Sequence, residues 1–378
     1  MDRLRPLVAG IEGGWRVDQD MLLDALVYAA AERKSLHSSC ASLLGIADDN
    51  TVRDYLNAAF PASSVRDLEH QVNHLLLADL PRELFERRHD IAIDFHDVPY
   101  YGRVGDLEGW VCRAEARAGT TRFVRIATAY VMRDGLRFNL AVKFVRSTHT
   151  KADILSTMLV WLRRHGLRIG CLWLDRGFAS VAVIQRLEAL RLAAVIACPI
   201  RGETGGTRAL CQGRSSYTAH YTLHSARDGR CTVRMAVVRA FTSSRGRPRR
   251  ARWLLYIQVG CRLTPAEVRR RYRSRFGIES SYRCLGQLRP RTSSRNPAIR
   301  FLCLGVGLVL VNLWTKLRYL HCRVLLPPRG FRRAPIFHED RSRLRLARLK
   351  DLLRHAVESV RGLRRLIQLE PPLCFGNH

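Results

Sequence analysis

The sequence predicts an α/β protein in which a mixed β-sheet with flanking helices is preceded by a helical N-terminal region and interrupted by a β-rich insertion. Three observations carry this prediction. Apolar residues recur at helical spacing in the N-terminal region and change to strand-like runs from residue 90. The order from there is three strands, helix, strand, helix and strand, which builds a sheet covered by helices. Further strand-like runs then separate this series from a helix with a clear start signal.

We expect five regions along the 378 residues, because ordinary domains run ~100–200 residues. They are a helical DNA-binding region at 1–88, the first part of the α/β domain at 89–200, the β-strand insertion at 201–262, the last part of the α/β domain at 263–320, and a basic helical C-terminal region at 321–378. The C-terminal region contains an amphipathic pattern over roughly 341–368, which could pack on the core or join two subunits.

The charge balance indicates a polyanionic partner. Lys and Arg number 64 against 33 Asp and Glu, giving a formal net charge of +31. Arginine forms bidentate contacts with phosphate, and nucleic acid is the commonest partner of so positive a protein. Genomic base bias is an alternative source of part of the arginine excess. Because the positive charge is spread along the chain, a basic tail on a neutral enzyme is excluded.

The cysteines and the chain start predict an intracellular protein. The 11 cysteines include no CxxC pair, and most lie in apolar stretches, which favours a reducing compartment. The start, MDRLRPLVAG, has no signal-peptide core. The apolar run at 301–314 is shorter than the ~20 residues that cross a bilayer, so a buried helix is predicted. We expect a cytoplasmic, nucleoid-associated location.

The helical N-terminal region contains a pattern typical of a helix-turn-helix. A short helix is predicted to end near Gly45, and Asn50 to cap a second helix that begins at Thr51. Arg53 and Asn57 would then lie on the exposed side of the second helix, suited to a DNA groove. An ordinary helical hairpin explains the pattern equally well.

Two other local motifs favour plain structure over chemistry. His70 and His74 have metal-ligand spacing, but no Cys or further His follows nearby, so a solvated helix face is predicted. The Gly-rich segment RGETGG lacks the Gly-Lys-Ser/Thr of a phosphate-binding loop. We therefore expect no nucleotide cofactor.

Two strands each present one aspartate. IAIDF at 91–95 contains Asp94, and RIGCLWLD ends in Asp175. Between them lie two alternating strands joined by Arg133-Asp134-Gly135, a hairpin signal, and a helix over about 150–165. Sites in such sheets lie where parallel strands end. The two aspartates are therefore predicted to meet at one edge of the sheet.

A third acid lies on the helix that follows the insertion. Thr264-Pro265-Ala266-Glu267 combines a capping Thr, a Pro at the first helical position and a Glu that completes a capping box. If this helix continues through EVRRRYRSRFGIESSYRCLGQL, then Tyr272, Arg275 and Glu279 share one face. Taken alone, Arg275 and Glu279 are better explained as a surface ion pair. Beside two strand-borne aspartates, they predict a functional site.

Two Asp and one Glu at a sheet edge predict an oxygen-rich site for Mg²⁺ or Mn²⁺, which prefer carboxylate ligands. Two such ions ~3.5–4 Å apart can activate the attacking oxygen and stabilise the leaving oxygen in phosphodiester displacement. A protein of charge +31 would repel metal ions unless carboxylates gathered locally. The same positive field would hold DNA.

The segments IAIDFHDVPYYGR, WLDRGF and YRSRFGIESSYR, followed by RTSSRNPAIRF and VNLW, resemble DDE-type insertion-sequence transposases of bacteria and archaea. The resemblance covers roughly residues 20–320 and implies a cut-and-paste enzyme with a ribonuclease-H-like domain and a β-strand insertion before the final acid. It implies that Asp94, Asp175 and Glu279 are the catalytic, metal-binding acids. It also implies DNA contacts for Tyr272 and Arg275, to which we add Arg176 beside the second acid.

Asp97 and His96, two close neighbours of Asp94, are also candidates for the site. Asp97 is a rival for the first catalytic position, but its place after the predicted strand suggests that it supports Asp94. His96 alternates with Asp94 along the strand and is given a minor role at the same site.

The sequence departs from the family pattern after the third acid. The family's helix continues with a Lys seven residues beyond the Glu, where this chain has Gly286; Gln287, Arg283 or Arg289 could substitute. Some members hold a flipped base with a Trp of the insertion. Trp253 is the only Trp within 201–262, and we assign it no such role.

The predicted function is a transposase acting on the terminal inverted repeats of its own element. Water would hydrolyse a phosphodiester to leave a 3′-OH, which would attack target DNA in the same site, without ATP. Holding two DNA ends together predicts a homodimer on double-stranded DNA. The alternatives are a nuclease on the same scaffold, from a decayed or repurposed element, and a non-catalytic, sequence-specific DNA-binding protein.

Overall fold

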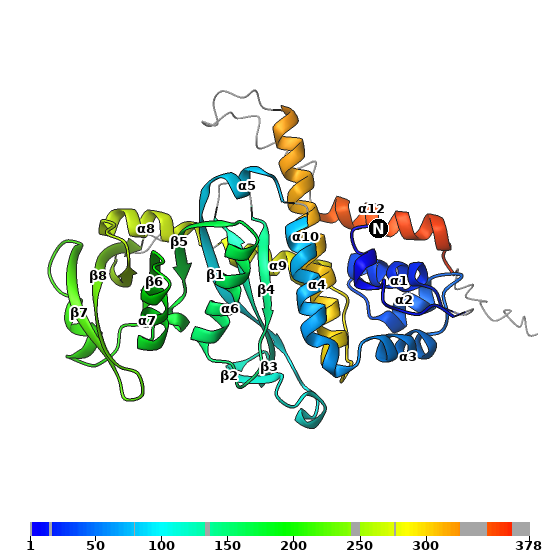
Figure 1. Cartoon of the computed structure of the whole chain (residues 1–378), viewed down its shortest axis with the longest axis horizontal. Coiled ribbons are helices and arrows are strands. Elements are labelled where there is room, and N and C mark those ends of the chain that lie inside the picture. The colour runs from blue at the N-terminus through cyan, green and yellow to red at the C-terminus, as the bar shows by residue number, and fades with distance from the viewer. Residues whose placement is uncertain are drawn as a thin grey trace, which may run out of the picture.

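The computed structural model describes residues 2–14, 17–78, 80–132, 137–242, 250–275, 277–325 and 346–364. A nine-stranded mixed sheet lies at the centre of this part of the chain (Figure 1). The strand order is β2-β3-β1-β5-β6-β9-β8-β7, and β4 also pairs with β3. The strands are β1 (Arg88–Pro99), β2 (Val111–Arg117), β3 (Thr120–Val131), β4 (Asn139–Phe144), β5 (Arg168–Leu174), β6 (Ala194–Cys198), β7 (Tyr217–Ser225), β8 (Gly229–Thr242) and β9 (Arg250–Val259).

Strands β1, β5 and β6 are parallel, and the remaining pairs are antiparallel. Because β9 pairs with β6, the strands of the predicted insertion continue the same sheet. Strand β2, which pairs with β3, was not expected from the sequence. The predicted hairpin signal at 133–135 lies outside the described residues, but β3 and β4 on either side of it are paired antiparallel.

Helices precede the sheet, cover both of its faces and follow it (Figure 1). The α-helices are α1 (Gln19–Glu32), α2 (Leu36–Ser42), α3 (Asp49–Ala59), α4 (Val65–Ala78), α5 (Glu83–Glu86), α6 (Lys151–Arg164), α7 (Val181–Ala189), α8 (Pro265–Ser274), α9 (Gly277–Leu288), α10 (Pro297–Leu325) and α12 (Leu346–Arg361). Short 3₁₀ turns lie at Arg5–Leu7, Ala62–Ser64, Val104–Leu107, Arg176–Phe178 and Gly206–Leu210.

The helices around the sheet begin where the capping residues predict. Thr150 caps α6 by accepting the N–H of Asp153, and Gly166 follows the helix with φ +80°. Thr264 and Glu267 form the predicted capping box at the start of α8. Caps of this kind contribute about 1 kcal/mol each, so they fix where the helices cross the sheet.

The two faces of the sheet carry different helices because side chains alternate along each strand. Ile91 and Ile93 pack on the face covered by α6 and α7. Ala92 and Trp173 pack on the opposite face, against α8 and α9. The alternation continues past the core, so Asp94 belongs to the α8 face and Phe95 to the α6 face.

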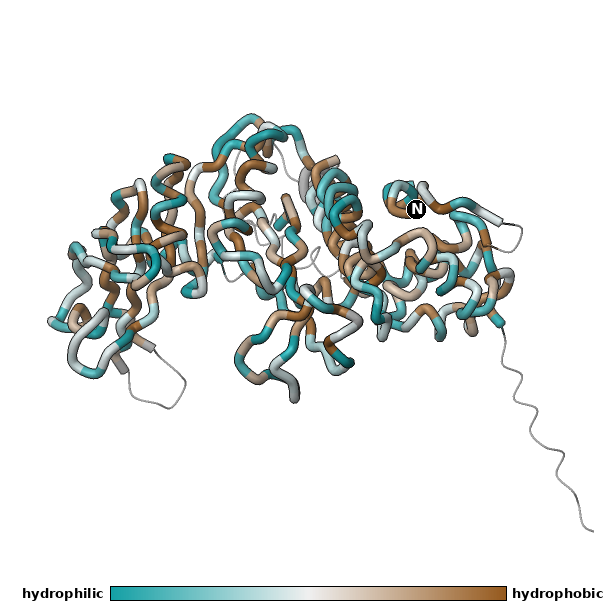
Figure 2. Tube along the Cα trace, turned by 60° about the horizontal axis from the view of Figure 1, so that its bottom comes forward, coloured by the Kyte–Doolittle hydropathy of each residue, from teal (hydrophilic) through white to brown (hydrophobic). Residues whose placement is uncertain are grey.

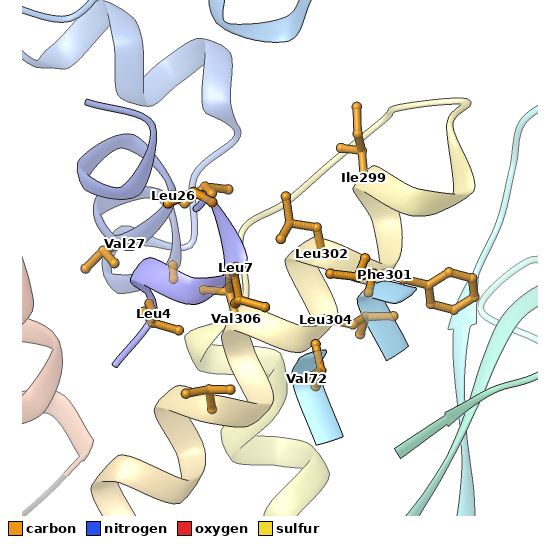
Figure 3. Close-up of a cluster of buried hydrophobic side chains, with 14 of the residues drawn as sticks. Leu4, Leu7, Leu26, Val27, Val72, Ile299, Phe301, Leu302, Leu304 and Val306 are labelled. Atoms are coloured by element: carbon orange, nitrogen blue, oxygen red, sulfur yellow. The ribbon is translucent and has the colours of Figure 1, made fainter. Parts of the chain in front are cut away.

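Helix α10 is the centre of a second core, between the sheet and α1–α3 (Figure 1). Figure 3 shows its Phe301, Leu302 and Leu304 beside Val72 of α4. A Cβ on Gly305 would lie 2.5 Å from Val72 Cγ2, so this glycine permits the close approach of α10 and α4. Hydrophobic residues gather where these helices and the strands pack (Figure 2).

The buried helix predicted at 301–314 is present, but it is longer than the apolar run. The segment Pro297–Leu320 is long and apolar enough to cross a membrane by length and composition alone, and 83% of its most apolar window is buried inside the protein. Most of the apolar residues of that window are therefore packed inside the protein core.

The N-terminal helix pair differs in one detail from the prediction. The cap of α3 is Asp48, whose carboxylate accepts the N–H groups of Asn50 and Thr51 at 3.0 and 3.1 Å, so the helix begins at Asp49. The expected cap, Asn50, was wrong because Asp48 is an equally good capping residue two positions earlier. Gly45 follows α2 with φ +63°, as a turn requires.

His70 and His74 are exposed on α4, as predicted for a solvated helix face. The fold brings His165, which directly follows α6, beside them. The ring centroids of His74 and His165 are 5.3 Å apart, and both rings also contact the ring of Trp161. No group of three His, Cys, Asp or Glu side chains in the described ranges could hold a metal ion, these histidines included.

The C-terminal helix packs on the N-terminal region. Arg361 Nε donates to Asp24 Oδ2 of α1 at 2.7 Å, and the carbonyl of Gly362 accepts the N–H of Leu44. The sequence left open whether this helix packs on the core or joins two subunits. These contacts show it packed on the N-terminal region of the same chain.

Candidate active site

Asp94 and Asp175 lie on neighbouring parallel strands. Ile93 of β1 is the register partner of Leu174 of β5, and each of these residues is followed directly by an aspartate, Asp94 or Asp175. Parallel strands are ~4.8 Å apart, which places the two carboxylates side by side. Asp94 is not at a strand end as predicted, because β1 continues to Pro99, but it lies where β5 ends beside it.

The turn after β5 fixes Asp175. Its Oδ1 accepts the N–H of Gly177 at 2.9 Å, which makes Asp175 the cap of the short turn Arg176–Phe178. A Cβ on Gly177 would lie 3.0 Å from Asp175 Oδ1, so a glycine here leaves room for the carboxylate. Arg176 is exposed and follows Asp175 directly.

Asp94 is an electrostatically costly residue. Its pKa is raised to about 6, chiefly by burial; the charge of Arg275 opposes this rise, and the charge of Asp175 adds to it. Arg275 Nη2 lies 2.7 Å from Asp94 Oδ2, and both side chains are largely buried. The site thus contains two crowded carboxylates and one buried cation.

Arg275 lies at a break between helices, which corrects the prediction of one continuous helix. Helix α8 ends at Ser274 and α9 begins at Gly277. The carbonyl of Arg275 accepts a hydrogen bond from the hydroxyl of Tyr130 at 2.7 Å and another from the N–H of Ile278 at 3.0 Å. Consequently Tyr272, Arg275 and Glu279 do not lie on one straight helical face.

Two buried tyrosines position the backbone around the acids. Tyr272 donates its hydroxyl to the carbonyl of Leu174 at 3.0 Å, next to Asp175. Tyr282 of α9 donates to the carbonyl of Asp94 at 2.9 Å and also pairs with Thr128 Oγ1 at 2.8 Å. Tyr282 was not singled out from the sequence; its place on the buried side of α9 was the available signal.

Glu279 lies in the first turn of α9, where the helix dipole favours a negative charge. It is exposed and lines an open pocket of about 1020 Å³ together with Asp175. The structure does not gather the three predicted acids into a metal-ligand cluster among the residues it describes. Asp94 and Asp175 nevertheless fit a divalent cation, because they are adjacent carboxylates whose charges repel.

The same pocket carries a strong positive charge. Its cationic lining residues come from the turn after β5, the segment after β6, strand β9 and helix α8: Arg176, Arg208, Arg252, Arg269, Arg273 and Arg275. Sequence patterns could not select these from the arginines of the chain, because only the fold brings the four segments together. Trp253, which received no role, lines this pocket too.

Asp97 does not support Asp94, contrary to the prediction. It lies within β1 and alternates with Asp94 onto the other face of the sheet. Arg125 Nε donates to Asp97 Oδ1 at 2.6 Å, and Arg117 pairs with its Oδ2. Asp97 is therefore a structural ion-pair partner, and the prediction failed because the strand was expected to end at Phe95.

His96 shares the face of Asp94 but stacks on Tyr282, with ring centroids 4.5 Å apart. The pKa of His96 is lowered to about 4, chiefly by burial and secondly by the positive charge of Arg289. Among the three residues considered in place of the missing lysine, Arg283 and Gln287 are exposed, whereas burial lowers the pKa of Arg289. A Cβ on Gly286 would meet open space.

Arg53 and Asn57 are exposed on α3, on the side of α10 away from the sheet (Figure 1). Arg53 donates to Asn50 Oδ1 at 2.8 Å, and Asn57 Oδ1 accepts from Asn296 at 3.1 Å. The structure does not bring these two residues into the pocket of the acids.

The architecture is that of a transposase-like mixed α/β fold. A cryo-EM structure of the piggyBac transposase synaptic complex with hairpin DNA is similar over 95% of this chain and 71% of that chain, with a TM-score of 0.52 and 12% sequence identity. A likeness at this identity shows the fold, and it confirms the predicted mixed sheet with flanking helices. No protein-family model matches the chain, and no curated protein matches its sequence.

Proposed function

We propose that this protein is a DDE-type transposase that cuts DNA at the ends of its element and joins them to target DNA. The observation that carries the proposal is the pair Asp94 and Asp175, which directly follow the register partners Ile93 and Leu174 of two parallel strands, together with the arginines that line a pocket beside Asp175. The transposase-like fold supports it, as do the sequence segments that contain the two acids.

In this proposal the residues of the pocket have separate tasks. Asp94 and Asp175 would hold Mg²⁺ or Mn²⁺, with Glu279 joining them as a third ligand in the DNA complex, and the two ions would supply Lewis acidity at the phosphodiester. The arginines of α8 and β9 bind the backbone phosphates of DNA. Tyr272 and Tyr282 keep the two aspartates in place through the carbonyls of Leu174 and Asp94. We further propose that two copies hold two DNA ends.

Cleavage of a supercoiled plasmid that carries the gene's own flanking DNA tests this function. Purified protein is incubated with Mg²⁺ or Mn²⁺, and products are mapped at nucleotide resolution. Wild type is compared with Glu279→Ala and, as a matched control, with Glu188→Ala, which removes an exposed glutamate of α7. We expect metal-dependent nicking at the element boundary by wild type and by the control, and none by Glu279→Ala.

The products separate the remaining alternatives. Joining of the cut 3′ ends to target DNA supports a transposase, whereas cutting without joining indicates a nuclease on the same scaffold. Binding without any nicking by a folded wild-type sample would make the protein a DNA-binding protein with structural acids. Cutting retained by Glu279→Ala would remove Glu279 from the mechanism and leave the two aspartates.

A further inference from the structure

A second, smaller pocket lies on the other face of β1 from Asp94. It has a volume of about 150 Å³, and its floor is formed by Phe95, Cys112, Val145 and Ile154. Phe95 directly follows Asp94, and its ring stacks on that of Phe178 with centroids 5.0 Å apart. Since Phe178 closes the turn that begins at Asp175, this stack separates the small pocket from the two acids.

The rim of this pocket is cationic. It is formed by Arg113, Arg125, Arg146, Ser147, His149 and Lys151, and none of the described residues that line the pocket is an acid. Arg125 is neutralised by Asp97, but Arg113, Arg146 and Lys151 are exposed. Burial lowers the pKa of His149, and the positive charges of Lys143 and Arg146 lower it further, whereas Asp153 acts in the opposite direction.

The rim is held in place by contacts that leave its charges available. Arg146 lies over the ring of Trp110, 4.7 Å from its centroid, and its backbone N–H donates to His149 Nδ1 at 3.1 Å. Lys151 Nζ donates to the carbonyl of Gly177 at 2.5 Å, which ties the pocket to the turn after Asp175. None of these partners is an anion, and no ion pair of Arg113, Arg146 or Lys151 is found within the described part of the chain.

We propose that this cationic pocket binds one backbone phosphate of the DNA whose neighbouring phosphodiester lies at Asp94 and Asp175. The size of the pocket suits one phosphate group, and its ring of donors around an apolar floor suits a phosphate with its sugar. A strand that crosses the edge of the sheet beside the Phe95–Phe178 stack would meet both sites. This inference rests on the proposed function for the identity of the polyanion.

The first test measures DNA binding in EDTA, so that cleavage does not contribute. Anisotropy of a labelled duplex from the flanking ends is followed against NaCl concentration. The double variant Arg113→Gln and Arg146→Gln is compared with Arg164→Gln and Arg186→Gln, which remove the same charge from exposed positions on α6 and α7. We expect the pocket variant to reduce the salt slope by about 1, as loss of one phosphate contact requires, and the control to leave it unchanged. Equal effects of the two double variants would overturn the proposal.

A second measurement locates the proposed contact on the DNA. Single phosphates of the duplex are replaced in turn by neutral methylphosphonate and binding to wild type is measured. We expect one position, outside the cleaved bond, at which the methylphosphonate lowers the affinity of wild type about tenfold. At that position it should not lower the affinity of the pocket variant below the value measured with unmodified DNA. If every position weakens both proteins alike, the pocket holds no phosphate.

The two proposals fail separately. If the pocket variant behaves like its control while Asp175→Ala abolishes cutting, only the phosphate site is wrong. If Asp175→Ala still cuts DNA, the catalytic assignment is wrong, whereas the methylphosphonate result continues to report on the pocket.

Discussion

Helix α8 and Arg275, which directly follows it, contact strand β1 through two ion pairs that differ in kind. At one, Arg271 donates Nε and Nη2 to Asp90 Oδ2 at 3.2 and 2.6 Å, and its guanidinium lies over the ring of Trp173. At the other, Arg275 Nη2 is 2.7 Å from Asp94, but its buried Nε has no hydrogen-bond partner among the described residues. The two arginines are four residues apart, and so are the two aspartates. The ion pairs therefore differ because of the side chains and solvent around them, and not because of their spacing.

The comparison indicates what Arg275 does. The Asp90 pair is a docking contact with directed hydrogen bonds, partly open to water. The Asp94 pair is buried beside a second carboxylate, and Arg275 acts chiefly as a positive charge. In the proposed metal site, a divalent cation beside Asp94 would supply the same kind of positive charge. We therefore interpret Arg275 as the residue that compensates Asp94 when no metal is bound.

The largest expected effect concerns cleavage. Asp94→Asn removes a proposed metal ligand, whereas Asp90→Asn removes only the docking contact. Loss of several kcal/mol of transition-state stabilisation predicts a rate reduction of about 10³-fold or more for Asp94→Asn. Asp90→Asn should change the rate less than about fivefold. The plasmid assay measures both, and equal losses would mean that both aspartates act through the docking of α8.

The next effect is the pH dependence of stability in the metal-free protein. The pKa of Asp94 is raised from 3.8 to about 6, so the folded state holds its proton more tightly than the unfolded state. This contribution is fully present below pH 3.8 and is lost as pH rises to 6, a change of about 3 kcal/mol. Unfolding by urea at pH 4, 5, 6 and 7 should show this decline.

Asp94→Asn provides the comparison for that pH profile. It leaves Arg275 without its counter-charge at every pH, so the slope of stability with pH is the informative quantity. The slope attributed to Asp94 should be absent from the variant. If wild type and Asp94→Asn give parallel profiles, the carboxyl of Asp94 titrates at its ordinary pKa.

A smaller effect is expected on metal affinity. Arg275→Gln removes a positive charge beside Asp94, so Mn²⁺ should bind about tenfold more tightly, a gain of about 1.4 kcal/mol. Arg271→Gln removes the same charge from the same helix and should change the affinity little. Electron paramagnetic resonance of free Mn²⁺ measures both without any reaction. Weaker binding by Arg275→Gln would show that Arg275 positions Asp94 and does not substitute for a cation.

Much of the fold was predictable because its signals are local. Strand alternation located Asp94 and Asp175, helical periodicity located α6, and a capping box located the start of α8. The length of β1 was not predictable from its apolar core, because His96 and Asp97 are accommodated by contacts with Tyr282 and Arg125 from other elements. That extension is what moved Asp97 out of the candidate site.

The helix-borne half of the site was the harder part. Helical periodicity runs through residues 265–288 without interruption, so it does not reveal that α8 ends at Ser274 and α9 begins at Gly277. The pairing of Arg275 with Asp94 likewise joins residues far apart in the chain. Sequence spacing therefore identified the residue types at the site, but wrongly placed Tyr272, Arg275 and Glu279 on one face of a single helix.

The smallest expected effect tests how firmly α9 holds β1 behind Asp94. Tyr282→Phe removes a hydroxyl that is bonded to the carbonyl of Asp94 and to Thr128 Oγ1 in a buried region. Both partners would remain buried with one bond fewer, which should lower the free energy of unfolding by about 1–2 kcal/mol. Tyr101→Phe, which removes a hydroxyl bonded to the carbonyl of Ala118 on an exposed ring, should cost less than about 0.5 kcal/mol. Urea unfolding measures both. An equal cost for the two variants would mean that the Tyr282 hydroxyl does not hold β1, and that the ring alone, stacked on His96, keeps the two elements together.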